Sequence, residues 1–159
     1  MCSSDLVTRN SDFDRYLAGD TSALSEDERR GWEIFQQAGC IRCHNGTNFS
    51  DNGFHRLGTS YRDKGRGAIT GAKQELYAFR TPGLRDVAST APYMHDGSLA
   101  TLTEVVEFCY RSTPVRAPGG LPLAFGPLNY RSFSEIPLLV AFLESLAGET
   151  PDAAPPRLP

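Results

Sequence analysis

The feature that most constrains this chain of 159 residues is one pentapeptide, Cys40-Ile41-Arg42-Cys43-His44. Its two cysteines stand three positions apart and the histidine follows directly, so a helical turn projects all three side chains to one side. This C-x-x-C-H spacing is the attachment signature of a c-type haem, whose vinyl groups bond to the two sulfurs while the imidazole binds iron. We therefore predict covalent haem c, held by Cys40 and Cys43, with His44 as the proximal iron ligand.

Other interpretations of the four cysteines are weaker. A thioredoxin-like redox pair needs a βαβ context, and a zinc site needs a second pair of ligands; the sequence offers neither. The stretch from Cys2 to Leu6 back-translates to the end of a common sequencing-adapter oligonucleotide. We therefore expect residues 1–6 to be an assembly artefact and the chain to be truncated. Cys2 is then not one of the protein's own cysteines.

Composition excludes two classes of partner. The formal charge of −3 supplies no excess of cations to neutralise phosphates, so we expect no nucleic-acid partner. In the C-terminal half, the longest unbroken apolar stretch is Leu138 to Leu143. Because a helix needs roughly 20 apolar residues to cross a bilayer, we expect no membrane span. The length fits one domain.

Two capping boxes mark the starts of helices. In a capping box, the side chain of each of two residues accepts a hydrogen bond from the backbone amide of the other. Ser25 with Glu28 begins a helix that Gly39 ends before the haem motif. Thr101 with Glu104 begins another. That second helix carries one apolar stripe at helical spacing: Leu102, Val105, Val106 and Cys109. The stripe predicts that the last of these, the cysteine, faces inward.

The remaining segments complete the prediction of an all-α, cytochrome c-like domain over residues 7–148. The segment 45–73 is rich in Gly, Asn, Asp, Ser and Arg, which predicts a long loop that wraps the haem or a partner. A last helix is expected from about Ser134-Glu135 to Gly148. Residues 149–159 are rich in Pro and Ala and are predicted to form a disordered tail.

Several runs besides the haem motif carry a family resemblance. They are Phe13 to Leu17, Phe54 to Gly58, Phe79 to Val87, Thr90 to Gly97, Thr101-Leu102 and Glu104 to Val106. On these runs, above all T-P-G-L-R and P-Y-M-H-D-G, the chain resembles the C-terminal haem domain of the bacterial di-haem cytochrome c peroxidase and MauG family. The resemblance extends over nearly the whole chain.

The resemblance implies an oxidoreductase with two haem domains in one chain. This domain would take electrons from a small cytochrome c or cupredoxin and pass them to a peroxide-reactive haem in a missing N-terminal domain. The intact periplasmic enzyme would reduce hydrogen peroxide or oxidise a partner protein, and no catalytic residue is assigned to this chain. The alternative is a stand-alone mono-haem cytochrome c that carries electrons and catalyses nothing itself.

The resemblance also implies roles for four further residues, two at the haem and two near the domain boundary. Arg85, and less directly Arg80, match positions that face haem propionates, where a planar bidentate cation fits; the competing interpretation is a surface salt bridge. Thr90 and Pro92 match positions whose backbone carbonyls bind a calcium ion.

The distal side of the iron is where the chain departs from the family, whose sixth ligand is Met or Tyr. Fourteen residues after His95, that position is Cys109. A thiolate binds haem iron, but a buried free cysteine is usually an inert small hydrophobe. Met94 is the second candidate ligand, and Tyr110 serves only if the helix register slips. His95 is expected to hydrogen-bond near the haem.

Overall fold

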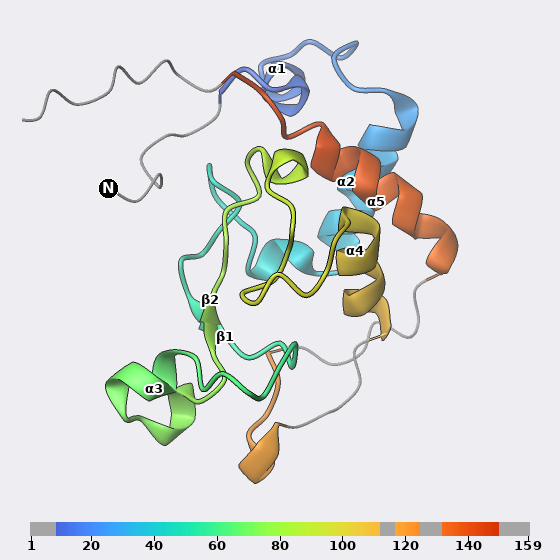
Figure 1. Ribbon diagram of the computed structural model, residues 1–159. Coiled ribbons are helices and arrows are strands. Elements are labelled where there is room, and N and C mark those ends of the chain that lie inside the picture. Colours follow the sequence, from blue (N-terminus) through green and yellow to red (C-terminus); the bar gives the residue numbers. More distant parts are fainter. Residues whose placement is uncertain (1–8, 112–116, 125–131, 150–159) are drawn as a thin grey trace, which may run out of the picture.

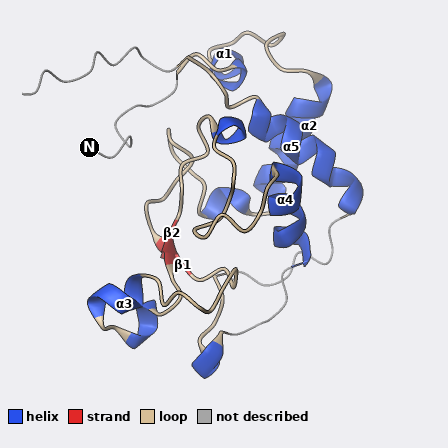
Figure 2. Ribbon diagram, in the orientation of Figure 1, coloured by secondary structure: helices blue, strands red, loops and turns tan. Residues whose placement is uncertain are grey.

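The computed structural model describes residues 9–111, 117–124 and 132–149 (Figure 1). The helices are α1 (Asp12–Leu17), α2 (Glu26–Gln37), α3 (Arg66–Thr70), α4 (Leu102–Arg111) and α5 (Ile136–Glu144). Helices α2, α4 and α5 pack together on one side of the domain, and long loops with two short strands occupy the other (Figures 1 and 2). Short 3₁₀ turns lie at Cys40–Arg42, Lys73–Glu75, Val87–Ser89, Pro118–Gly120 and Phe133–Glu135. In the described part of the chain, no helix is long and apolar enough to cross a membrane.

Capping boxes begin three of the helices, of which two were predicted. The Ser25 hydroxyl accepts from the Glu28 amide at 3.3 Å, while the Glu28 carboxylate accepts from the Ser25 amide at 2.7 Å. Thr101 and Glu104 make the same reciprocal pair at the start of α4. Sequence reasoning missed the third box, which begins α1 at Ser11 and uses an aspartate in place of glutamate.

Helices α2 and α5 cross so closely that their backbones touch. At the crossing lies Gly31, where a Cβ atom would stand 2.0 Å from the Leu138 carbonyl oxygen and 2.8 Å from the Phe142 Cβ. No side chain fits in that space, so glycine is required in the middle of a helix despite its unfavourable helix propensity.

An aromatic cluster fills the core beside this crossing. Its rings contact one another mostly edge-to-face or tilted, with centroids 5.0 to 6.4 Å apart. The members are Phe13, Trp32, Phe35, Phe49 and Phe142. The Phe35 ring also lies 6.5 Å from the His44 ring, so the haem motif packs directly against the core.

The prediction of an all-α fold is corrected by a small antiparallel sheet. Strands β1 (Phe54–His55) and β2 (Phe79–Arg80) pair with His55 opposite Phe79. The segment 45–73, predicted as loop, therefore contains β1, and also α3. Two-residue strands are too short to show an alternating apolar pattern, and their pairing is decided by partners far along the chain.

The last helix begins as predicted but ends earlier. The 3₁₀ turn at Phe133–Glu135 leads into α5, which ends at Glu144 rather than at Gly148. Gly148 instead allows the chain to approach Arg9, whose carbonyl oxygen would lie 2.4 Å from a Cβ there. Glu149 pairs with Arg9 in an isolated antiparallel bridge. The predicted tail over 149–159 begins with this paired Glu149; its other residues and the expected artefact at 1–6 lie outside the described residues.

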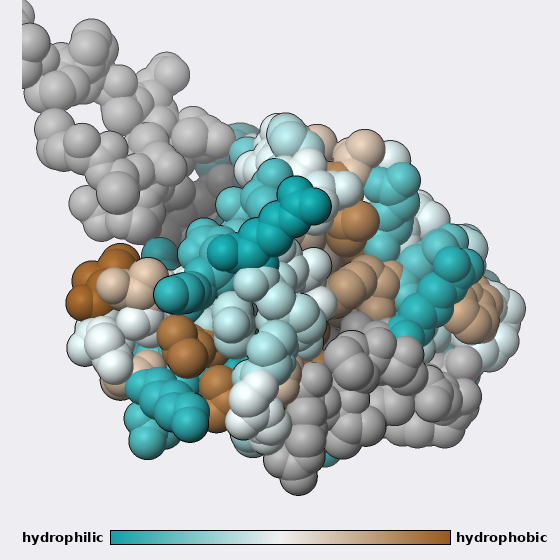
Figure 3. Space-filling model, turned by 60° about the horizontal axis from the view of Figure 1, so that its bottom comes forward, coloured by the Kyte–Doolittle hydropathy of each residue, from teal (hydrophilic) through white to brown (hydrophobic). Residues whose placement is uncertain are grey.

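Among the described residues, four large hydrophobic side chains are exposed. Ile69 is the most exposed of them at 89%, and the others are Leu17, Phe54 and Phe133. On the face drawn in Figure 3, hydrophobic residues lie among strongly hydrophilic ones. Singly exposed apolar residues of this kind are normal for a globular protein and by themselves indicate no interface.

Replacing Gly31 by Ala tests the close crossing. Because the new methyl group must displace the α5 backbone, we expect the free energy of unfolding to fall by about 2–3 kcal/mol, although Ala is the better helix former by about 1 kcal/mol. Denaturant unfolding of the haem-loaded chain measures the change. Gln37→Ala at an exposed position of α2 is the control and should change stability by no more than about 0.5 kcal/mol. Equal midpoints for the two variants would contradict the crossing.

Candidate haem-binding site

The C-x-x-C-H motif lies in a tight turn at the end of α2. Gly39 adopts the left-handed conformation, with φ of 83°, which ends the helix. The 3₁₀ turn that follows is closed by hydrogen bonds from the Cys43 and His44 amides to the Cys40 carbonyl, at 3.3 and 3.0 Å. Neither Cys40 nor Cys43 forms a disulfide, and both are half-buried. The local geometry thus presents both sulfurs from one turn of backbone.

The His44 ring is held in a form that can bind iron. Its Nδ1 lies 3.0 Å from the Phe49 carbonyl oxygen, so the tautomer with Nδ1–H leaves the lone pair on Nε2. Burial lowers the pKa of His44, an effect opposed by the Phe49 carbonyl, the Asp51 charge and the Pro82 carbonyl. The ring is therefore neutral at neutral pH. Two half-buried thiols and one oriented, neutral imidazole are the set of groups that a c-type haem requires.

Cys109 faces inward from α4, as the apolar stripe predicts. Burial raises the pKa of its thiol to about 12, with a further contribution from the neighbouring Cys40. The residue as a whole keeps intermediate exposure, so the high pKa reflects the apolar surroundings of the sulfur itself. The adjacent Tyr110 is 3% exposed, and its hydroxyl donates to the Glu135 carboxylate at 2.9 Å. This hydroxyl is therefore bonded to the 3₁₀ turn that precedes α5. Cys109, close to the haem motif, is therefore the better placed of these two candidates.

The other candidates for iron or calcium lie on the loop that precedes α4. Met94 is half-buried and has a left-handed backbone conformation, with φ of 69°. Thr90 and Pro92 are exposed, and the Thr90 hydroxyl donates to the Val87 carbonyl at 2.9 Å. Met94 as a distal ligand and a calcium ion on the Thr90 and Pro92 carbonyls stay predictions.

The two arginines expected at haem propionates contact protein groups. Arg85 is 12% exposed and donates to the Asp14 carboxylate at 2.7 Å and to the Thr47 carbonyl at 2.9 Å. Its guanidinium also lies 5.6 Å from the centre of the Phe49 ring. Arg80 is exposed and donates to the Asn52 side chain. In this structure Arg85 thus ties α1 to the loop that carries Phe49, and its propionate role stays a prediction.

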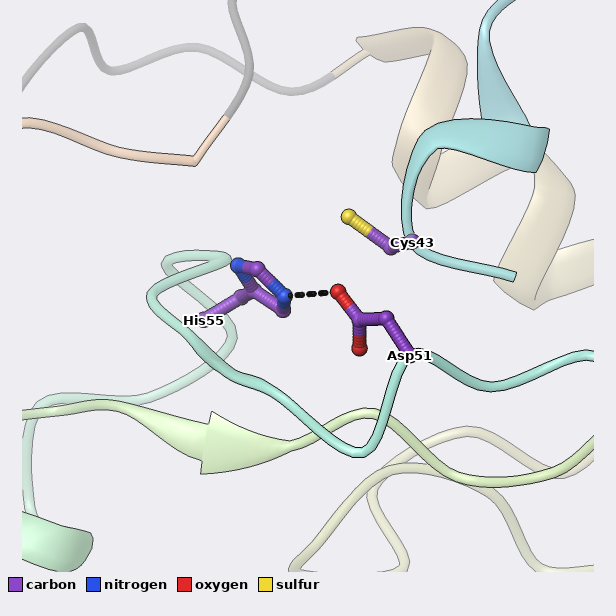
Figure 4. A group of neighbouring side chains, drawn as sticks. All are labelled: Cys43, Asp51 and His55. Carbon is purple, nitrogen blue, oxygen red and sulfur yellow. Dashed lines mark hydrogen bonds and ion pairs between the residues drawn. The ribbon is translucent and has the colours of Figure 1, made fainter. Parts of the chain in front are cut away.

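The structure brings together one group of polar residues that sequence reasoning missed. Cys43, Asp51 and His55 place one sulfur, one carboxylate oxygen and one ring nitrogen within 4.8 Å of one another (Figure 4). Asp51 Oδ2 lies 2.7 Å from His55 Nε2. These donors are of kinds that bind transition metals, but haem attachment would convert the Cys43 thiol into a thioether. The only signal of this group in the sequence is the spacing of four residues between Asp51 and His55, which a turn of the backbone brings together.

Two further residues with unassigned roles also make defined contacts. The His95 ring stacks on Phe79, with centroids 3.6 Å apart, and its Nδ1 lies 3.3 Å from the Thr59 hydroxyl. Arg56 is 8% exposed and donates to the backbone carbonyls of Gln74, Leu76 and Pro122. Both residues fasten loops to β1 and β2. Arg56 was seen in the sequence only as part of a longer run, whereas His95 was expected to hydrogen-bond near the haem and here lies beside the Thr59 hydroxyl.

Comparison with known proteins identifies the relatives of this chain. No protein-family model matches it. A cytochrome c551 peroxidase of Nitrosomonas europaea is 37% identical over 162 residues, which cover 97% of this chain and 44% of the relative. A methylamine utilization protein MauG of Methylophilus methylotrophus is 36% identical over 97% of this chain and 47% of its own length. This chain is homologous to the di-haem cytochrome c peroxidases and MauG proteins.

Solved structures support the fold of this di-haem peroxidase and MauG homologue. A MauG-like protein associated with microbial copper homeostasis superposes with a TM-score of 0.75 at 30% identity, over 88% of this chain and 49% of its own. The di-haem peroxidase BthA of Burkholderia thailandensis gives a TM-score of 0.70 at 23% identity and supports the fold alone. The chain spans about half the length of the relatives it matches. Proteins of this family use covalently bound haem c.

Replacing Arg85 by Met tests the tie between α1 and the Phe49 loop. The loss of this half-buried pair should lower the free energy of unfolding by about 1–2 kcal/mol at pH 7. Arg15→Met, which removes an exposed ion pair with Asp12, is the control and should cost at most about 0.5 kcal/mol.

The same variant should also change the acid sensitivity of the chain. Burial raises the pKa of Asp14, but hydrogen bonds from Arg85 and Ser11 outweigh it and lower the pKa below 3.8. The stabilisation is therefore complete above pH 3.8 and is lost as the pH falls through the lower, folded-state pKa. We expect Arg85→Met to lose less stability in that acid range than the parent. An unchanged acid profile would contradict the Asp14–Arg85 pair.

Proposed function

We propose that this chain is the haem c electron-transfer domain of a di-haem cytochrome c peroxidase or MauG-like oxidoreductase. The observation that carries the proposal is the turn at Cys40–His44, where two half-buried thiols accompany a neutral imidazole whose Nδ1 is anchored by Phe49. Homology over 97% of the chain supports the choice of protein class.

The residues of the chain supply attachment, orientation and exclusion of water. A bound haem contributes one-electron chemistry through its ferric and ferrous states. Cys40 and Cys43 would hold it covalently, and His44 would bind its iron through Nε2. The Phe49 carbonyl accepts from Nδ1–H, which orients the ring and raises its basicity. Phe35, 3% exposed, packs against His44 and keeps water from that side of the ring.

The remaining parts of the proposal concern the intact protein. Electrons arrive from a small cytochrome c or cupredoxin in the periplasm, and this domain passes them to a peroxide-reactive haem in an N-terminal domain. The relatives support the existence of a further domain, because they are peroxidases and MauG proteins about twice as long as the matched region. In a peroxidase, hydrogen peroxide is the final electron acceptor. In a MauG-like enzyme, a partner protein is the electron donor that hydrogen peroxide oxidises.

Covalent attachment is the decisive property to test. When the full chain is produced together with a haem-attachment system, we expect one haem that stays bound after denaturation, measured by mass spectrometry. Cys40→Ser and Cys43→Ser should each leave one thioether, and the double variant should release its haem on denaturation. Cys109→Ser serves as the control and should keep both bonds. A parent chain without covalently bound haem would overturn the proposal.

The stand-alone electron carrier is distinguished by the gene itself. We expect an independent long read of the DNA upstream of Val7 to reveal an in-frame domain with a second C-x-x-C-H and an export signal. A start codon and a short signal peptide directly before this domain would instead establish the mono-haem carrier, and the peroxidase assignment would then describe only the relatives.

We further propose Cys109 as the distal ligand of the iron, with Met94 as the alternative. Its inward position on α4 and its closeness to Cys40 support this choice. Cys109→Ser should change the ferric absorption and electron paramagnetic resonance spectra, whereas Met94→Leu should leave both unchanged. An effect of Met94→Leu alone would transfer the role to Met94, and unchanged spectra in the Cys109 variant would remove the thiol as a ligand.

A further inference from the structure

The Asp51 carboxylate is fixed beside the haem motif by its own backbone and side chain. Its amide donates to the Cys43 carbonyl at 2.8 Å, so the loop after the motif folds back over it. Its side chain accepts from the Gly53 amide at 2.8 Å and lies 2.7 Å from His55 Nε2. Figure 4 shows the carboxylate and the ring directed toward one another, with the Cys43 sulfur beside them. The side chains of Asp51 and His55 are 24% and 30% exposed, so both are partly shielded from water.

Asp51 carries a negative charge over the whole physiological range. Desolvation raises the pKa of Asp51, but the nearby Thr81 hydroxyl, the Gly53 amide and His55 outweigh it and lower the pKa to about 2. The Gly53 amide and the His55 ring keep the carboxylate in one position. The chain therefore holds a permanent, oriented charge at this point.

The Asp51 carboxylate lies beside the part of the chain that would hold a haem. One of its oxygens is within 4.8 Å of the Cys43 sulfur, and its own amide is bonded to the Cys43 carbonyl. Because the Coulomb interaction weakens with distance, a charge this close to Cys43 acts on a haem bonded to that sulfur.

We propose that Asp51 is the residue of this chain that tunes the reduction potential of the haem, holding it low, while His55 fixes the carboxylate in place. The inference rests on the proposed function, since it concerns a haem bonded to Cys43 and His44. Ferric iron carries one positive charge more than ferrous iron, so a nearby anion stabilises the ferric state. One electron added to the iron must overcome that stabilisation, and the potential falls. Asp51 acts through this charge and touches no reacting atom.

The test is the midpoint potential of the haem-loaded full chain, measured by spectroelectrochemistry at pH 7 and low ionic strength. Asp51→Asn keeps the size and the hydrogen-bonding shape but removes the charge, and it should raise the potential. We expect about a tenfold change in the electron-exchange equilibrium constant, which corresponds to 59 mV for a one-electron couple. Asp63→Asn, at an exposed carboxylate outside the group of Figure 4, is the matched control and should shift it much less.

Two further variants separate charge from local structure. Asp51→Glu retains the charge and should stay close to the parent potential, which also covers the case in which Asp51→Asn folds poorly. His55→Gln retains a hydrogen-bond donor for Asp51 and should not raise the potential. A rise in His55→Gln equal to that in Asp51→Asn would overturn the proposal, because loss of the contact rather than of the charge would then be responsible. Equal potentials for Asp51→Asn and Asp63→Asn would overturn it too.

The failure of this inference differs from failure of the proposed function. A parent chain that carries no haem gives no redox signal at all, and the proposed function then fails. A parent chain with a normal haem signal whose potential ignores Asp51 refutes only the tuning role.

Discussion

The close crossing of α2 and α5 is the constraint on which the rest of the domain depends. Because Gly31 has no side chain, the two backbones meet and the aromatic rings on either side of the contact form one cluster. The C-x-x-C-H turn follows α2 after the left-handed Gly39, so its position relative to the core is set by that crossing. A displacement of α5 would therefore move the ring of Phe35, and with it the surroundings of His44.

Phe49 connects the core to the chemistry of the site. Its ring belongs to the aromatic cluster and is 5% exposed, while its carbonyl oxygen accepts from the proximal imidazole. Arg85 lies over the same ring and pairs with Asp14 in α1, so the loop that orients His44 is tied to a second helix. A metal-binding histidine needs such a partner to fix its tautomer, and here that partner is built into the hydrophobic core.

Much of the helical framework was accessible from the sequence because its signals are local. Capping boxes at Ser25 and Thr101 predicted the starts of α2 and α4, and the stripe on α4 predicted the inward direction of Cys109. The sheet escaped prediction because each strand has only two residues and finds its partner far along the chain, as His55 and Phe79 do at a separation of 24 residues. The role of Arg85 was inferred from resemblance alone, and no local pattern pointed to its pairing with Asp14.

The sequence by itself determined the cofactor-binding motif, since the spacing of Cys40, Cys43 and His44 is a property of one turn of backbone. It also determined the protein class, through runs that resemble the di-haem peroxidases and MauG proteins. Only the tertiary structure decided what surrounds that motif. The tautomer of His44 depends on the Phe49 carbonyl, and the charge beside Cys43 depends on a turn that brings Asp51 and His55 together. Such contacts are set by packing between segments, and a linear pattern carries no direct signal of them.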